Sequence, residues 1–401
     1  MNKKRAALLL LACLTVPLLT GCFNSKELNQ LSVALAMGID TVDGDYMVSV
    51  QLVDPSQMSK NKVPDRSPTT VHSETCSTVF ECVRKMTTKT SREIYFSHLQ
   101  MLIFDEETAR KGIKEPLDVL FRDPEIRPDF QLAVVKNKQA KDVLEFVTAT
   151  ELLPALEMFK SLKVSEKLWA PTSSVNVLEL LRGFELDGRN PVITGMTLSG
   201  DMKKGKSLQN VKQPHVPANF HYTGIGMFRQ DRLVGWMNED ESKAYTYIMN
   251  RVTSTAGLVN CPHSDNKFIA EVTHSHVKIK AHIEDGKPKG SLHAMVTANV
   301  GEVECDVNLS DEKVFLELEE HVSYELKDIL ERGVRKAQKY KADVFGFGEA
   351  FHRKYPKHWR QWKDDWEEMF SELPVEIKVD YKLEKMGQII SPIDPKTNRE
   401  D

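Results

Sequence analysis

Apart from one apolar run near its start, the 401-residue sequence lacks any stretch long enough to span a membrane. That run, residues 6–19, is itself shorter than the roughly 20 apolar residues that a transmembrane helix needs. The composition, with 41% hydrophobic and 28% charged residues, is ordinary for a soluble protein. We therefore expect the rest of the chain to form an extracytoplasmic globular body of two or three domains.

Cysteine is also scarce, and positive charge is not in excess. The formal net charge is −4, and it becomes more negative once the basic start Lys3, Lys4 and Arg5 is removed, which argues against nucleic acid as a partner. Besides Cys13 and Cys22 in the first part of the chain, the remaining cysteines are Cys76, Cys82, Cys261 and Cys305. Four cysteines do not make a disulfide scaffold in a chain of this length, so we expect free buried thiols.

Enzyme motifs are missing as well. The sequence has no G-x-S-x-G, H-E-x-x-H, P-loop or G-x-G-x-x-G, and "TGIGMF" (223–228) lacks the helix and the last glycine of a phosphate loop. Acid–base catalysis by the plentiful carboxylates is unsupported rather than excluded, because a sequence cannot show a raised pKa pair. We expect no catalytic residue and no cofactor.

The best metal candidate is a group of cysteine and histidine residues. His274 and His276 would share one side of a strand, as metal ligands can. That side also tends to face solvent, and the group matches no recognised ligand spacing, so we expect no metal. The full group is Cys261, His263, His274 and His276, with His282 and His293 nearby.

The apolar run ends in "LLTGCFNS" (18–25), which holds a lone cysteine. A basic start, an apolar core and the small pair Thr20-Gly21 before Cys22 are typical of a bacterial lipoprotein signal peptide, here residues 1–21. Cleavage would leave Cys22 as the first residue, with a thiol that carries diacylglycerol, and several acyl chains anchor a protein firmly to a bilayer. The alternative is an ordinary signal peptide with an incidental cysteine.

Residues 22–190 alternate between strand-like and helical patterns. Two strand-like runs, 31–40 and 46–55, are joined by the turn signal Asp43-Gly44. A helix that starts at Ser73 and carries both Cys76 and Cys82 is expected next. Strands at 97–105 and 129–135 then alternate with helices at 106–121, 138–147, 154–165 and 175–184. This order predicts a sheet covered by helices on at least one face.

Residues 191–309 are rich in strand patterns. The stretch 221–237 predicts a hairpin, because two apolar runs flank the polar residues 229–232. Asn238 and Glu241 form the pattern of a capping box for a following helix. Alternation then runs through 267–305.

Residues 310–401 contain the longest helical pattern, at 310–340. A stripe of four aromatic residues follows within 356–370, and it predicts a helix docked on a sheet rather than an aromatic ligand site. The stripe consists of Trp359, Trp362, Trp366 and Phe370. Alternation in 373–387 predicts a closing strand.

Taken in order, four stretches resemble the C subunit of spore germinant receptors, the Ger(x)C lipoprotein family of endospore-forming bacteria. The first, "GCFNSKELNQLSVALAMGID", matches a lipidated cysteine, an aromatic residue, R/K-E-L and a strand that ends in G-I-D, although Phe23 and Asn24 replace a common Trp-Asp. The others are residues 97–128 with the turn "RDPEIRP", residues 224–237, and residues 340–370 with the final strand. The resemblance spans nearly the whole chain.

The resemblance implies an α+β fold of three domains, each a β-sheet packed with helices, after the cleaved signal peptide. We place these domains at 22–190, 191–309 and 310–401. It also implies that Cys22 carries both S-diacylglycerol and an N-palmitoyl group, on the outer face of the inner spore membrane. We expect the turn residues to be structural rather than ligand-binding, namely Arg122, Asp123, Arg127 and Pro128.

The function implied is that of a lipid-anchored, non-catalytic subunit of a nutrient germinant receptor, needed for the germination response. Its implied partners are the membrane-embedded A and B subunits and, through Cys22, the lipid bilayer. One alternative is a solute-binding lipoprotein of an importer, but the sequence shows no internal repeat that would build two similar lobes. Another is a cell-wall hydrolase, which would need His274 or His276 for turnover.

Overall fold

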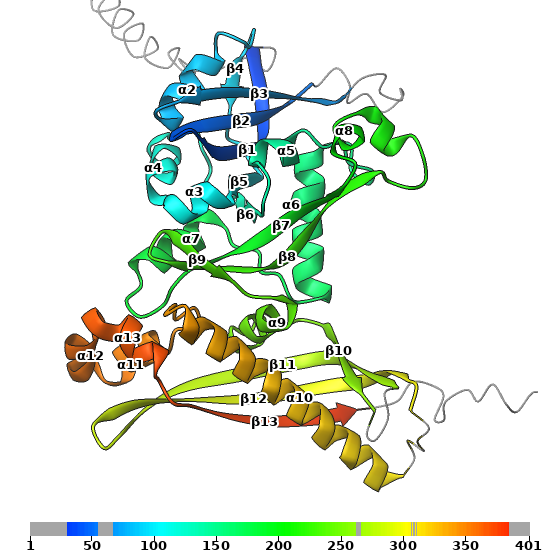
Figure 1. The fold of residues 1–401 in the computed structure, drawn as a ribbon, viewed down its shortest axis with the longest axis vertical. Coiled ribbons are helices and arrows are strands. Elements are labelled where there is room, and N and C mark those ends of the chain that lie inside the picture. The colour runs from blue at the N-terminus through cyan, green and yellow to red at the C-terminus, as the bar shows by residue number, and fades with distance from the viewer. Residues whose placement is uncertain are drawn as a thin grey trace, which may run out of the picture.

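A computed structural model describes residues 30–54, 67–261, 266–305, 307, 309 and 311–384 of the chain. Figure 1 shows an elongated molecule with one β-sheet in its upper part and a second sheet at its lower end. Helices cover both sheets, so the predicted α+β class is confirmed.

The first sheet has nine strands in the order β3-β2-β1-β5-β6-β7-β8-β9, and β4 pairs with the start of β1. The central pairs β1/β5, β5/β6 and β6/β7 are parallel, whereas β1/β2, β2/β3, β7/β8 and β8/β9 are antiparallel. The strands are β1 Leu31–Val42, β2 Asp45–Val53, β3 Thr69–Cys76, β4 Glu93–Tyr95, β5 Met101–Asp105, β6 Gln131–Val135, β7 Val192–Gly200, β8 Ala218–Arg229 and β9 Arg232–Trp236.

Helices pack on both faces of this sheet. Parallel strands covered on two sides read as continuous apolar runs, and every residue of β5 and β6 is buried. Leu102 and Phe104 join the core on one face, while Met101 and Ile103 join the core on the other. The helices in this part are α2 Val79–Met86, α3 Glu106–Lys111, α4 Lys114–Arg122, α5 Ala140–Leu144, α6 Pro154–Leu168, α7 Val177–Glu185 and α8 Met202–Gly205, followed by the 3₁₀ turn η4 Leu208–Val211.

The second sheet has four strands in the order β10-β11-β12-β13. β13 runs parallel to β12, so the chain must cross over between them, and the crossover contains the long helix α10. α10 lies across one face of the sheet (Figure 1), where its buried stripe includes Leu318, Val322 and Leu326. These elements are β10 Thr255–Asn260, β11 Lys267–Glu284, β12 Lys287–Val303, α10 Glu312–Lys339, α11 Phe347–Lys354, α12 Pro356–Trp362, η5 Lys363–Asp365, α13 Trp366–Ser371 and β13 Val375–Glu384.

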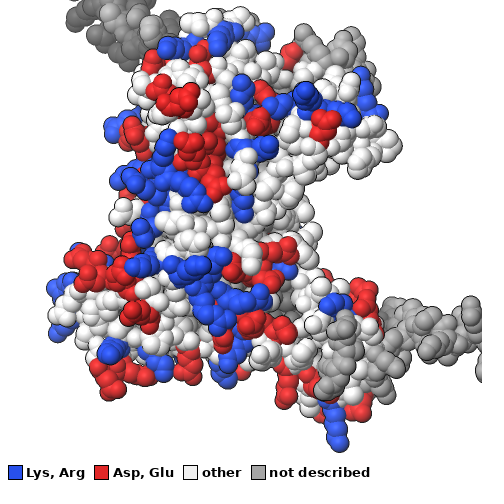
Figure 2. All heavy atoms as spheres, in the orientation of Figure 1, with Lys and Arg blue, Asp and Glu red and all other residues white. Residues whose placement is uncertain are grey.

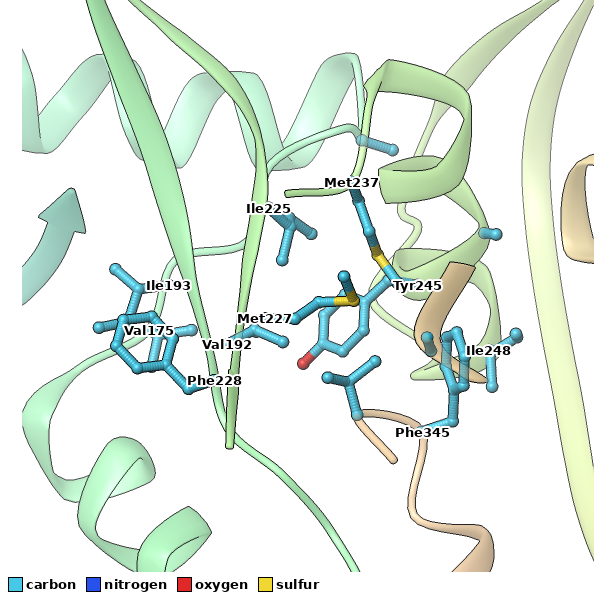
Figure 3. Close-up of a cluster of buried hydrophobic side chains, with 14 of the residues drawn as sticks. Val175, Val192, Ile193, Ile225, Met227, Phe228, Met237, Tyr245, Ile248 and Phe345 are labelled. Atoms are coloured by element: carbon cyan, nitrogen blue, oxygen red, sulfur yellow. The ribbon is translucent and has the colours of Figure 1, made fainter. Parts of the chain in front are cut away.

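The helix α9, Glu239–Ile248, lies between the two sheets and is buried from Ser242 to its end. Figure 3 shows Tyr245 and Ile248 of α9 between side chains of the first sheet, such as Met227, and Phe345 of the C-terminal region. Members of both sheets belong to one continuous apolar core. The two parts are therefore packed against each other rather than merely joined by a linker.

Polar contacts reinforce this junction. Asp240 and Glu241 of α9 pair with Arg332 and Lys336 of α10 at 3.0 Å and 3.3 Å. Arg251, just after α9, pairs with Glu166 of α6 and Glu179 of α7, and it donates to the backbone oxygen of Ser174. On the face shown in Figure 2, basic and acidic side chains lie next to each other over the whole height of the molecule.

Several local predictions are confirmed. β1 and β2 form the predicted hairpin around Asp43-Gly44, and β8 and β9 form the hairpin at 229–232. The capping box of α9 has both reciprocal bonds, from the Glu241 amide to Asn238 Oδ1 at 2.9 Å and from the Asn238 amide to Glu241 Oε2 at 2.8 Å. The closing strand is β13.

Other local predictions are wrong. No helix starts at Ser73, because residues 69–76 pair with β2 as an edge strand, and α2 begins only after its N-cap Thr78. The predicted helix 106–121 is divided into α3 and α4 around Gly112, whose φ of 134° is not helical. Likewise, the aromatic stripe is divided between α12 and α13, with η5 between them, rather than lying on a single helix.

The cysteine prediction holds for only two of the four residues. Cys76 in β3 and Cys82 in α2 are free and buried, whereas Cys261 and Cys305 form a disulfide that closes 44 residues of sequence. Burial raises the pKa of the Cys82 thiol to about 12, so this thiol stays protonated. The disulfide joins the end of β10 to the residues just after β12, which no local spacing could reveal.

The predicted domain division is not settled by the sheets. Strands β7, β8 and β9 follow residue 190 but belong to the first sheet, and β13 follows residue 310 but belongs to the second. The boundaries 22–190, 191–309 and 310–401 therefore stay predictions.

Candidate functional site

An apolar groove lies between α2 and α4, at the end of the molecule where the described chain begins. Its volume is about 580 Å³. Ile94, Phe96 and Leu120 are buried in its floor, and the ring of Phe80 remains 54% exposed at one side. A large aromatic side chain that is half exposed beside an apolar hollow is typical of a binding surface.

The local sequence explains why α2 presents this side. Thr78 accepts the Glu81 amide at 3.2 Å and fixes the start of the helix. Val79, Cys82 and Met86 face the sheet and are buried, so the opposite side of the helix, with Phe80, Val83 and Arg84, faces the groove.

Charged side chains surround the apolar floor. Arg84 lies over the Phe80 ring, with its guanidinium carbon 5.1 Å from the ring centre. Arg122 pairs with Asp118 at 2.6 Å on the exposed side of α4. The acidic residues that line the groove are Glu93, Asp123 and Glu125. An apolar floor with mixed charges at its edge suits a peptide better than a small charged solute.

The turn "RDPEIRP" forms one wall of the groove, through residues 122–126. Asp123 Oδ1 accepts the Glu125 amide at 2.9 Å, and Ser97 donates to the Glu125 backbone oxygen. Arg127 pairs with Asp129 and Pro128 is exposed, outside the groove lining. Asp123 therefore shapes the turn, as predicted for it, while the turn as a whole lines a cavity.

Two other motifs of the resemblance have structural roles. Asp40, the last residue of the G-I-D motif, accepts the amides of Ala140 and Lys141 at 2.5 Å and 3.1 Å and so caps α5. Its burial raises the pKa of the carboxyl to about 7. This aspartate is fully buried, and both of its carboxylate oxygens accept amides of α5, so it does not act as an acid toward solvent.

Asp343 organises the aromatic region in the same way. Its carboxylate is buried and accepts the amides of Gly346, Phe347 and Gly348 and the Trp366 indole, at 2.7–3.1 Å. Burial raises its pKa to about 6, although these four donors favour the charged form. Trp359, Trp366 and Phe370 are buried and Trp362 is partly exposed, so the stripe forms core rather than a ligand site.

The histidine candidates that the structure describes do not converge, and His263 lies outside the described residues. His274 and His276 are exposed on β11, where they face the side of the sheet opposite α10, and Cys261 is used in the disulfide. Instead, His293 contacts Asp380 at 2.5 Å, and His282 contacts Ser291 at 3.0 Å. Within the described ranges, no three His, Cys, Asp or Glu side chains are placed to hold a metal ion.

Cys22, the residue predicted to carry the lipid, lies outside the described residues. Among the helices that the structure does describe, none combines the length and apolar composition needed to cross a bilayer.

Comparison with known proteins first supports the fold. A crystal structure of the GerBC protein aligns with a TM-score of 0.54 over 86% of this chain and 96% of that one, at 19% identity. The mixed fold of two sheets and helices is therefore shared with GerBC.

The sequence comparisons then give the family. The model "Spore germination protein N-terminal domain" matches residues 24–198, and "Spore germination B3/ GerAC like, C-terminal" matches residues 223–387. The chain belongs to this GerAC-like family of spore germination proteins, as the sequence resemblance predicted.

Curated relatives cover the same length. Spore germination protein KC of Bacillus subtilis (strain 168) is 29% identical, over 97% of this chain and 98% of its own. Spore germination protein B3 of the same organism is 24% identical over 92% and 95%, and GerQC of Bacillus cereus is 22% identical over 92% and 96%.

The groove itself was missed by sequence reasoning. Its walls come from α2, from residues 93–96 and from the end of α4, which are distant in sequence. The one available signal was Phe80, a large aromatic residue that does not share the face of the buried Val79, Cys82 and Met86.

Proposed function

We propose that this protein is a lipid-anchored, non-catalytic subunit of a nutrient germinant receptor, with Cys22 as the anchor. The observation that carries the proposal is the family match in both halves, at residues 24–198 and 223–387. The lipoprotein signal that ends at Cys22 supports an anchored location, on the outer face of the inner spore membrane.

The partners we propose are the membrane-embedded A and B subunits of the same receptor. What supports these partners is the family match, because the resemblance of this chain is to the C subunit of a receptor that also contains A and B subunits. The importer alternative is disfavoured, since a nine-stranded mixed sheet and a four-stranded sheet do not make two similar lobes around a cleft.

The test compares nutrient-triggered germination of spores that carry the wild-type gene, a deletion, Cys22→Ala or Cys13→Ala. We expect the deletion to abolish the response to one class of nutrient. Cys22→Ala should weaken it about tenfold or more, because anchoring raises the local concentration near the partners. Cys13→Ala removes a cysteine from the signal peptide without removing the acylated residue, so it should behave as wild type.

Two results would contradict the proposal. One is an unchanged response of the deletion to every nutrient after related receptors are also removed. The other is saturable binding of a solute by the purified body alone, which would favour the importer.

A further inference from the structure

The apolar groove between α2 and α4 has an open side, and the described chain begins beside it. We propose that the anchor segment of this same chain, residues 22–29, lies in the groove, with Leu28 and Phe23 packed on its apolar floor. The docking itself does not depend on the proposed function, whereas its consequence at the membrane does.

Gln30 puts the anchor segment within reach. It lines a second cavity of about 540 Å³ together with Thr87 and Glu93, and both of these residues also line the groove. Leu28 is two residues before Gln30, a distance of about 7 Å in an extended chain. Its side chain can therefore enter the groove at the Thr87 end.

The length of the segment also fits. The groove follows α2 from Thr87 back to Phe80, about 10 Å at the helical rise. Residues 23–28 span up to about 17 Å when extended, so Phe23 can reach Phe80 while Leu28 stays near Val83. Phe23 would then cover the ring that is 54% exposed in the described structure.

Charge and polarity agree with this occupant. The segment "CFNSKELN" carries one positive and one negative side chain, Lys26 and Glu27, between its two apolar residues. The groove is lined by both Arg84 and Arg122 and by the acidic residues Glu93, Asp123 and Glu125. Each charge of the segment thus has an opposite charge within the same rim.

The consequence for an anchored protein is geometric. With Phe23 in the groove, Cys22 would leave from the surface of the body rather than from the end of an eight-residue tether. The acyl chains would then fix this end of the molecule against the bilayer, in one orientation. A free tether of that length would instead allow displacements of up to about 27 Å.

The experiment uses the mature chain, residues 22–401, with Cys22→Ser, so that no lipid is attached. Leu28→Asp is compared with Ser25→Asp, which adds the same charge to the same segment. Hydrogen exchange of α2 and of residues 119–126 should be about tenfold faster in Leu28→Asp than in the control. In addition, a benzoylphenylalanine photocrosslinker at position 28 should label residues 79–96 or 119–126, and one at position 25 should label them less.

Equal exchange in the two variants, or no label in the groove, overturns the proposal. Protection that appears only after phosphatidylglycerol vesicles are added also overturns it, because the occupant would then be the bilayer. Protection only in the presence of the membrane subunits would assign the groove to a partner instead. Because the protein in this experiment is not lipidated, none of these results bears on whether Cys22 anchors the native chain.

Discussion

Two aromatic regions of this molecule differ in packing: one is filled by buried rings, and the other borders an open cavity. Around Asp343, four aromatic rings are buried together, and the ring centres of Phe351, Trp359 and Phe370 each lie 5.2–6.5 Å from that of Trp366. Between α2 and α4, Phe80 stands half exposed beside a cavity of about 580 Å³. The first region is filled by its own chain, and the second leaves room for another segment.

The difference teaches that aromatic density is a poor guide to binding in this protein. The conspicuous stripe "WRQWKDDW" builds core because Asp343 ties three backbone amides and the Trp366 indole into one cap. The functional candidate is built from less conspicuous residues, since one exposed phenylalanine and a turn suffice once a cavity separates two helices.

The largest expected effect is that of Asp343→Ala. It removes the acceptor of four buried N–H groups and should lower the free energy of unfolding by about 3–5 kcal/mol. Urea unfolding followed by tryptophan fluorescence measures it. Asp364→Ala is the matched control, because Asp364 is exposed on η5, and its effect should stay within about 0.5 kcal/mol. Similar losses of unfolding free energy in the two variants would mean that Asp343 does not hold the aromatic region together.

The next effect tests how tightly the filled region packs against the connection between α7 and β7. A Cβ on Gly188 would lie 2.4 Å from the backbone carbon of Gly348, and Gly188 has φ of 84°. Gly188→Ala should therefore cost about 2–4 kcal/mol, from strain and overpacking together. Gly44 has φ of 96° but no atom near its Cβ position, so Gly44→Ala should cost only about 1 kcal/mol. Equal losses would mean that conformational strain, not contact, dominates at Gly188.

The smallest expected effect on stability belongs to the groove. Phe80→Ala should change the free energy of unfolding of the non-lipidated chain by less than about 1 kcal/mol, whereas the buried Phe351→Ala should cost about 3–5 kcal/mol. In spores, Phe80→Ala should be present at the normal level but should weaken the germination response. A loss from Phe80→Ala as large as that from Phe351→Ala would show that Phe80 belongs to the core.

Much of the fold could be read from the sequence where the signal is local. Turn residues predicted the hairpins at Asp43-Gly44 and at 229–232, and the capping-box pattern predicted the start of α9. The 28-residue α10 has a buried stripe with the spacing that a helix requires. The family itself was also predictable, since its motifs occur in order along nearly the whole chain.

What the sequence could not give depends on contacts between distant residues. Residues 69–76 have no strong alternation, and only pairing with β2 makes them a strand. The Cys261–Cys305 disulfide likewise requires two strand ends to meet. The groove has the same difficulty, because its walls come from three segments that are separate in sequence.

The helix α9 between the two sheets has a mechanical consequence. Side chains of α9 pack on both sheets, α9 pairs with α10, and Arg251 just after it pairs with α6 and α7, so the described parts of the chain are held together at this level. A close-packed interior transmits displacement with little compression. A displacement or rotation imposed at the α2–α4 end would therefore move the second sheet together with the first, as one rigid body.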